Sequence, residues 1–531
     1  MSASGAVALL YYHSLFSRPP LKMIAQIFLL ILLLQSSDAK EGSQFSIREA
    51  TIPEIQTAFK QNKLTSKSLV EFYIHEIQKL NPIYRAVIEV NPDALHEAQR
   101  ADEERKANAP KSRFGLHGIP ILVKDNIATK DNLNTTAGSY AFLKSVVPRD
   151  AGVVEKLRES GAIILGKASL SEWAHFRSSN APSGWNARAK QAVNPYVATV
   201  DPCGSSTGSA ISVATNMVTV SLGTETDGSI LCPSSANSVV GIKPTLGLTS
   251  RAGVIPISPR QDTVGPICRT VTDAVYVLDA IAGFDKNDAV ATKKASKYIP
   301  EGGYLKHLKS GGLKGKRLGI VRAYPYFGFD NDIETLNKFE KHFMILRKNG
   351  ATLIDNLEVT NYDDIQPLFI GEVIALFAEF KIALNAYLKE LVTSPVRSLA
   401  DVIAFNEKFA NLEKIDDYPQ DLFLEAEKTN GIGKIEKEAL KNLTKASKNG
   451  FEKLMKENKL DALVTPYSYG STVLAIGGYP GITVPGGYDE NGAPYGICFG
   501  GLKGSEPTLI EIAYGFEQAT KLRKPPPIND H

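Results

Sequence analysis

Residues 201–244 read DPCGSSTGSAISVATNMVTVSLGTETDGSILCPSSANSVVGIKP, and the predicted fold is organised around them. Glycine and hydroxylated residues fill both ends of this stretch, at 204–209 (GSSTGS) and 223–229 (GTETDGS), while 210–222 is apolar enough to be a buried rod. Glycine lets the backbone approach a ligand closely, and a helix starting near Gly208 would direct free N–H groups at the first turn. The stretch therefore predicts a pocket of hydroxyls and backbone donors, which would suit a phosphate cradle or a hydrolase centre.

The phosphate interpretation is the weaker one. A P-loop needs a lysine after its last glycine, and no lysine follows these glycines. The Gly-x-Gly-x-x-Gly pattern of dinucleotide-binding folds is also absent. A Ser/Gly-rich surface loop remains an alternative, but an ordinary connection has no need of a second hydroxyl-rich turn.

Composition indicates a soluble globular protein with a large core. The chain has 531 residues, of which 43% are hydrophobic and 22% charged. A net charge of +3, without a basic stripe interleaved with aromatics, argues against a nucleic-acid partner. The four cysteines, Cys203, Cys232, Cys268 and Cys498, are too few and scattered for a disulfide scaffold or a zinc site. Cys203 and Cys232 border the central stretch and could pair.

The N-terminus carries a targeting signal. Residues 24–34 (IAQIFLLILLL) form an apolar run preceded by Arg18 and Lys22, which predicts a secretory signal peptide within residues 1–39. Met23 could be the true start, and an uncleaved anchor is the alternative, although the run is short for a bilayer. Sequons at Asn134 and Asn442 agree with a glycosylated, secreted protein without stable membrane insertion after leader removal.

Helical patterns alternate with short apolar strands along residues 40–531. A helix, a Gly-Ala pair and a strand follow one another at 153–166 and again at 333–354. This alternation predicts an α/β fold in one large domain, with a mixed central sheet covered by helices on both faces. Residues 361–459 are mostly helical and charged, which indicates a helical elaboration; 293–316 is expected to be an exposed connection and 477–487 a turn-rich strand edge.

Three arrangements could activate a nucleophile. Gly204 to Gly208 matches the Gly-x-Ser-x-Gly elbow around Ser206, but Pro202 interrupts the strand that should lead into it. The histidines that follow, His307, His342 and His531, lie in no turn-rich setting. A zinc hydrolase is disfavoured because no His-x-x-x-His pair occurs.

The third arrangement uses a lysine. Lys124 ends an apolar strand at 119–123, and burial would lower its pKa toward that of a base. The alternative is a lysine that extends from the strand end to water.

The residues at 204–209, 223–230 and 241–245 resemble the amidase signature family. Further matching motifs at 118–125 (GIPILVKD), 262–266 (DTVGP) and 478–485 (GYPGITVP) extend the resemblance over most of residues 40–531. The form TDGS at 226–229 is most similar to the peptide amidase branch. The resemblance implies a serine hydrolase of carboxamides that needs neither metal nor cofactor.

The resemblance also implies the site. By motif, Ser229 is the nucleophile, Ser205 is a bridging serine that follows a cis peptide bond, and Lys124 is the general base. The backbone N–H groups of Thr226, Asp227 and Gly228 would form the oxyanion hole. A lysine base must be deprotonated, which predicts an alkaline activity optimum.

The chain departs from the family at three positions. Many members have glycine at the positions of Cys203, Thr207 and Asp227. A carboxylate beside an oxyanion is repulsive, so we expect Asp227 to point away or to accept a hydrogen bond.

The resemblance leaves open what the protein acts on. C-terminal peptide amides or small acyl amides are the expected substrates. A subunit of a tRNA-dependent amidotransferase and a catalytically silent member of the fold are the alternatives. Aromatic residues at Tyr324, Tyr326, Phe327 and Phe329 could line the substrate pocket or pack in the core, and the sequence makes no prediction of oligomeric state.

Overall fold

The computed structural model describes residues 45–108, 115–323, 333–359 and 365–528. The chain divides into two compact units, 1–46 and 47–531, and the fold below is that of the second. The predicted leader and the aromatic residues at 324–329 lie outside the described residues. Among the residues described, no helix is both long and apolar enough to cross a bilayer.

Eleven strands of the described residues join in one mixed sheet, in the order β1-β3-β2-β4-β6-β5-β10-β11-β9-β7-β8. β2 is parallel to β3 and to β4, whereas the run from β4 to β9 is antiparallel. The strand bounds are β1 Val87–Val90, β2 Pro120–Lys124, β3 Ile163–Ala168, β4 Val220–Glu225, β5 Val240–Lys243, β6 Thr263–Cys268, β7 Arg317–Gly319, β8 Thr352–Ile354, β9 Ala462–Pro466, β10 Gly481–Tyr488 and β11 Pro494–Gly500.

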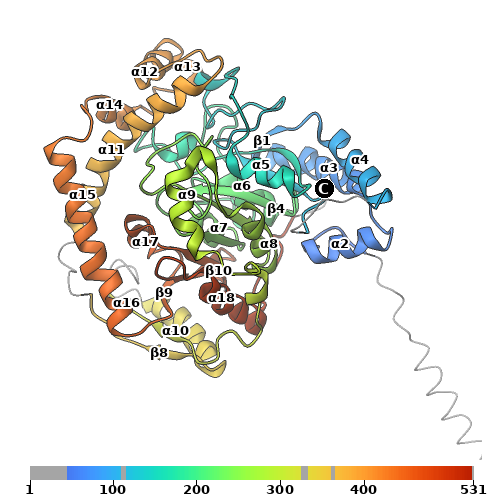
Figure 1. Ribbon diagram of the computed structural model, residues 1–531, viewed down its shortest axis with the longest axis vertical. Coiled ribbons are helices and arrows are strands. Elements are labelled where there is room, and N and C mark those ends of the chain that lie inside the picture. The colour runs from blue at the N-terminus through green and yellow to red at the C-terminus, as the bar shows by residue number, and fades with distance from the viewer. Residues whose placement is uncertain (1–44, 109–114, 324–332, 360–364, 529–531) are drawn as a thin grey trace, which may run out of the picture. The chain divides into compact units, whose positions relative to one another are not determined.

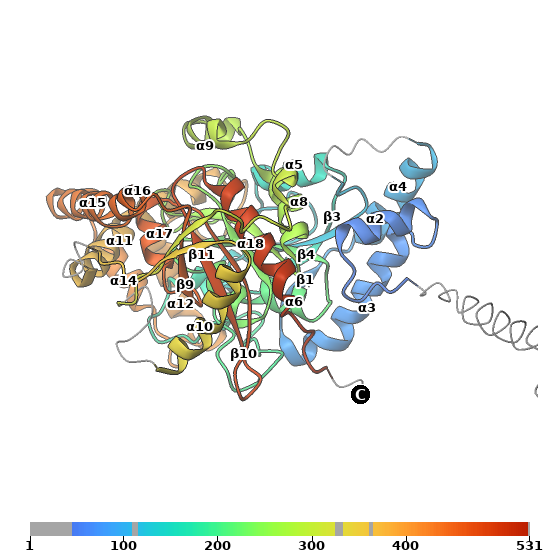
Figure 2. The ribbon, with the colours of Figure 1, turned by 90° about the horizontal axis from the view of Figure 1, so that it is seen from below.

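Helices flank this sheet (Figures 1 and 2). α6 packs on β4, α7 on β5, β10 and β11, α8 on β6, and α18 on β10. Their bounds are α2 Ile52–Lys60, α3 Ser66–Tyr84, α4 Ala94–Lys106, α5 Gly152–Glu159, α6 Thr207–Ala214, α7 Leu231–Ala236, α8 Val271–Ile281, α9 Ala289–Ala295, α10 Ile333–Lys348, α11 Ile365–Glu390, α12 Leu399–Lys408, α13 Ala410–Glu413, α14 Asp421–Glu427, α15 Lys434–Ser447, α16 Lys453–Glu457, α17 Ser471–Gly477 and α18 Glu506–Thr520. The predicted α/β class is confirmed.

One edge of the sheet gathers the ends of the central strands. β2 and β4 are parallel, so Lys124 and Glu225 end at the same edge. Thr263 begins β6 opposite Glu225, and Gly481 begins β10 opposite Lys243, the last residue of β5. This edge is called the Lys124 edge below.

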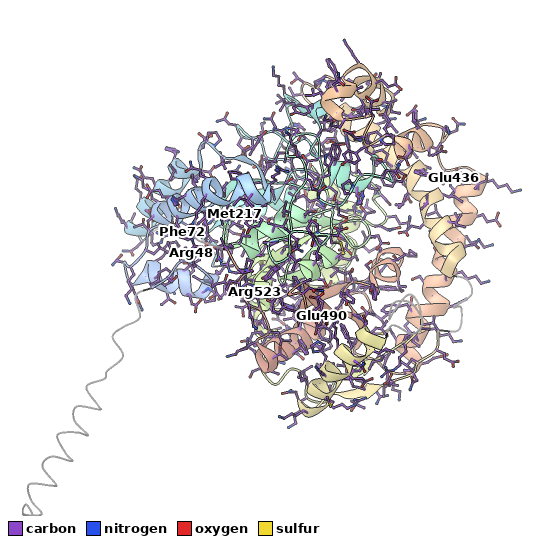
Figure 3. All side chains as sticks on the ribbon, turned by 180° about the vertical axis from the view of Figure 1, so that it is seen from behind. Arg48, Phe72, Met217, Glu436, Glu490 and Arg523 are labelled. Carbon is purple, nitrogen blue, oxygen red and sulfur yellow. A yellow bond between two sulfur atoms is a disulfide. The ribbon has the colours of Figure 1, made fainter. Side chains whose placement is uncertain are left out.

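Local sequence signals explain where several helices begin and end. Thr51 and Thr65 cap α2 and α3 with reciprocal side-chain bonds to the third helical residue. α5 is followed by Gly161 at φ +76°, a conformation that side chains other than glycine rarely adopt, and β3 then begins. Arg523, after the last helix, pairs with the carboxylate of Glu49, just before α2. Figure 3 labels Arg523 and Arg48, the residue that precedes Glu49.

The structure corrects three expectations. Residues 210–222 are not one rod, because they hold the end of α6 and the start of β4. Residues 293–316 are not simply exposed, since Tyr304 is fully buried and its N–H donates to Asp279 at 2.7 Å. Residues 477–487 lead into a central strand, β10, rather than an edge strand. Pro485 is tolerated in this strand because the register shifts between Pro485 and Gly487, and at such a bulge the missing N–H of proline interrupts no hydrogen bond of the ladder.

Candidate active site

Lys124 is the last residue of β2 and is fully buried. Its Nζ lies 2.8 Å from Ser205 Oγ, 3.0 Å from Ser206 Oγ and 3.2 Å from the carbonyl oxygen of Thr224. Burial lowers the pKa of Lys124 to about 7, and the negative charges of Glu225 and Asp262 offset part of that effect. A large share of the lysine is therefore a neutral amine at neutral pH.

The hydroxyl geometry shows which partner can give that amine a proton. Ser206 Oγ donates to the Thr224 carbonyl oxygen at 3.0 Å and accepts from the Thr224 N–H at 3.2 Å. Its proton is thus engaged, and Ser206 can only accept from Lys124. Ser205, also fully buried, keeps its hydroxyl proton available for the lone pair of neutral Lys124.

The turn that carries Ser205 is joined to the turn that carries Ser229. The Gly204–Ser205 peptide bond is cis. The N–H of Ser206 donates to the Ser229 carbonyl oxygen at 3.2 Å, so the two hydroxyl-rich turns meet at the Lys124 edge. Ser229 is 8% exposed, whereas Ser205 is completely covered. Of the two serines, Ser229 is therefore the one that a ligand can reach.

Three carboxylates hold the turn at 226–229. Glu225 accepts from the N–H groups of Ile230 at 2.6 Å and Leu231 at 2.9 Å, and Asp262 accepts from the Thr226 hydroxyl at 2.6 Å. The third, Asp227, accepts from the Thr472 hydroxyl of α17 at 2.6 Å. Asp227 accepts a hydrogen bond, which was one of the two expected outcomes, although the donor belongs to the chain itself.

A buried acid lies behind the same turn. Gln261 Nε2 donates to the Thr226 carbonyl oxygen at 3.3 Å and to Glu372 of α11 at 2.5 Å. Burial and the nearby charge of Asp227 raise the pKa of Glu372 to about 8. Glu372 is thus mostly protonated at neutral pH, which limits the negative charge that α11 adds beside the turn.

Ser206 is not placed to act as a nucleophile with a histidine. Among the described residues, His307 pairs with Glu511 at 3.0 Å and His342 packs against Phe339 and Phe516. His531 lies outside the described residues. Nor do His, Cys, Asp and Glu side chains gather anywhere in the described part of the chain in a group suited to a metal ion.

The Amidase family model matches residues 68–475, which include Lys124, both serine turns and most of α17. The chain belongs to the amidase family. It is 59% identical to a probable amidase of Arabidopsis thaliana over 98% of this chain and 99% of that protein. The X-ray structure of native peptide amidase from Stenotrophomonas maltophilia shares 40% identity and a TM-score of 0.84, over 90% of this chain and 98% of that one.

These likenesses establish the type of enzyme. This amidase is a hydrolase of the peptide amidase type that acts on carbon–nitrogen bonds in linear amides. A glutamyl-tRNA(Gln) amidotransferase component from Thermoanaerobacter pseudethanolicus is a more distant relative, with 30% identity over 90% of this chain and 97% of that protein.

A disulfide joins the two serine turns of this amidase. Cys203 pairs with Cys232, with 5.9 Å between their Cα atoms and a sequence separation of 29. Cys203 lies two positions before Ser205, and Cys232 three positions after Ser229. The bond therefore closes a loop that contains both serines.

Breaking this bond should destabilise the protein. For a loop of this length, the chain-entropy model assigns roughly 3–4 kcal/mol to the cross-link. With a phosphine reductant present, we expect the free energy of unfolding measured in urea to fall by about that amount, so that the urea midpoint decreases. The Cys203→Ser/Cys232→Ser double variant should be less stable and indifferent to the reductant. Equal stability of oxidised and reduced wild type would contradict the prediction.

Sequence reasoning missed several residues that shape the site. The sequence motif indicates Ser206 only as a possible nucleophile, whereas in the structure its hydroxyl accepts a hydrogen bond from Lys124. Glu225 lies inside the quoted motif, and its carboxylate accepts from the N–H of Ile230, only five residues later in the chain. Thr472 and Gln261 have no such signal, because their contacts with 226–227 depend on the folding of segments far apart in sequence.

Proposed function

We propose that this amidase hydrolyses C-terminal peptide amides or small acyl amides through an acyl-enzyme on Ser229, with Ser205 and Lys124 as a proton relay. The observation that carries the proposal is the buried Lys124 Nζ, with its pKa lowered to about 7, at 2.8 Å from Ser205 Oγ. A lysine in this state can act as a base near neutral pH.

The reaction would begin with a proton moving from Ser205 to neutral Lys124, while Ser229 gives its own proton to Ser205. The Ser229 oxygen then attacks the amide carbonyl carbon, and the proton on Lys124 returns through Ser205 to the departing ammonia or amine. Water, deprotonated by the same relay, cleaves the ester and restores Ser229. Every proton that leaves a nucleophile is returned, so the cycle needs no cofactor.

The oxyanion would be bound by backbone donors. Asp227 and Gly228 lie in the turn before Ser229, and the structure records no acceptor for their N–H groups among the described residues. The bond from Thr472 orients the Asp227 carboxylate toward α17, so this negative charge has a partner of its own. Backbone donors fixed in this way stabilise the charge that develops in the transition state.

A panel of amides would test the substrate class. N-acetylated dipeptide and tripeptide amides, short aliphatic amides and long-chain fatty amides would be compared by ammonia release, each with its matched free acid as a blank. We expect the peptide amides to have the highest kcat/KM. Equal or better hydrolysis of the fatty amides would reject the peptide assignment while leaving amide hydrolysis intact.

We also propose that the protein enters the secretory pathway. The apolar run at 24–34 supports this location, and the Cys203–Cys232 bond fits an oxidising compartment. The two sequons differ: Asn442 is exposed on α15, whereas the Asn134 side-chain amide donates to the Glu89 carboxylate at 3.0 Å and is half-buried.

A glycan should therefore form at Asn442 rather than at Asn134. When the full chain is expressed in plant or yeast cells, we expect endoglycosidase treatment of the secreted protein to shift its mobility by one glycan. Asn442→Gln should remove the shift and Asn134→Gln should keep it. An unglycosylated protein retained in the cytosol would reject the proposed location.

A further inference from the structure

A cavity of about 460 Å³ lies at the Lys124 edge, and no step proposed above uses it. One wall is the connection Gly477–Tyr479, which leads from α17 into β10, and another is the α15–α16 region. α15 packs against α17 (Figure 1). Leu246, just after β5, and Leu502, just after β11, also line it at the same edge of the sheet.

The charged residues that line the cavity are mainly basic. Arg260, Lys448, Lys456 and Lys503 line it, against the single carboxylate Glu452. That carboxylate is already bound by Lys456. Lys448 and Lys503 make no ion pair with any of the described residues. The cavity therefore presents unbalanced positive charge.

Arg260 adds a donor that lacks an acceptor. Its Nε and Nη2 bind Glu379 of α11 at 2.9 and 3.1 Å, but its Nη1 is buried without a partner among the described residues. A buried N–H without an acceptor is costly, but this atom has almost no accessible surface, so a ligand in the cavity would contact it only after the Arg260 side chain moves. The neighbouring Gln261 donates to the Thr226 carbonyl oxygen, so the same loop contacts both the cavity and the turn of Ser229.

The sheet sets the separation between the cavity and Ser229. β10 lies three strands from β4 in the order β4-β6-β5-β10. Neighbouring strands are about 4.8 Å apart, so β4, which leads to Ser229, and β10, which follows the cavity wall at Gly477–Tyr479, lie about 14 Å apart along the Lys124 edge. An extended peptide rises about 3.4 Å per residue, and this separation corresponds to about four residues.

We propose that this cavity binds an acidic side chain of a peptide substrate, about four residues before the amide that Ser229 attacks. The inference rests on the proposed function and names the class of peptide amide that the site prefers. Lys448 and Lys503 supply the positive charge for its carboxylate, since Glu379 already balances that of Arg260. The substrate residues nearest the reacting amide would lie outside this cavity, so the cavity does not select among them.

The test compares two N-acetylated hexapeptide amides of an alanine scaffold, with Glu or Gln at the fourth residue from the amide. We expect the wild type to hydrolyse the Glu peptide with about fivefold higher kcat/KM, the size expected for two solvent-exposed ion pairs. The preference should shrink in high salt. In the Lys448→Glu/Lys503→Glu variant the ratio should fall to one or below. Because the readout is a ratio, a general loss of activity in the variant cancels.

Lys445→Glu is the matched control, since Lys445 is exposed on α15 and does not line the cavity. This variant reverses one charge three residues from Lys448, outside the cavity, and should keep the wild-type ratio. The proposal is overturned if the wild type treats both peptides equally, if the preference survives the double charge reversal, or if Glu is favoured only beside the amide. Failure to hydrolyse either peptide would instead reject the proposed function.

Discussion

Ser229→Ala should lower the hydrolysis of a peptide amide by roughly 10⁴-fold or more, as for other nucleophiles that act in a relay. We expect this loss because a substrate can reach Ser229, which is partly accessible, but cannot reach Ser205, which is completely covered. The measurements are kcat for ammonia release and covalent labelling by a fluorophosphonate probe, which the variant should lose.

Ser206→Ala is the informative comparison for that experiment. It removes a hydroxyl one residue from Ser205 and weakens the anchoring of Lys124, but it leaves Ser229 in place. We expect this variant to be slower and still to be labelled. Persistent labelling of Ser229→Ala at the wild-type rate would show that another serine is the nucleophile.

The second large effect concerns Lys124. Lys124→Met keeps the length of the buried side chain but removes the base, and general-base catalysis is typically worth about 10²–10⁴-fold. We expect kcat to fall by about that factor while the thermal unfolding midpoint does not decrease, since the wild-type lysine must be desolvated to fold.

The pH profile gives a readout that a structural role would not produce. The pKa of Lys124 is lowered to about 7, so the amine that accepts a proton predominates above that pH and the ammonium below it. kcat/KM should rise with pH through about 7 and level off above it, falling about tenfold per unit well below the pKa. A rate that is flat from pH 5 to 9, or that rises toward acid, would exclude Lys124 as the base.

Much of the local structure follows from short-range patterns. The run at 119–123 predicted a buried strand that ends at Lys124, and β2 ends there. The helix–Gly–Ala–strand patterns are confirmed as α5 with β3 and as α10 with β8. These predictions succeed because hydrophobic periodicity and a glycine after the helix depend only on neighbouring residues.

The arrangement of the site depends on pairings that no local pattern encodes. The central place of β10 is decided by pairing with β5, far earlier in the chain. Likewise, the Thr472–Asp227 bond joins segments 245 residues apart. The motifs predict Lys124, Ser205 and Ser229 as the site residues, whereas the residues that contact this site from distant segments depend on the tertiary fold.

The Cys203–Cys232 bond also determines how the protein reacts with electrophiles that modify thiols. The remaining two cysteines, Cys268 and Cys498, are buried, and burial raises the pKa of both thiols. The folded, oxidised enzyme thus offers thiol-specific reagents no accessible thiol, and inactivation by such reagents would indicate molecules in which the cross-link is reduced. Sensitivity to maleimides would then show that the Cys203–Cys232 bond is reduced in part of a preparation.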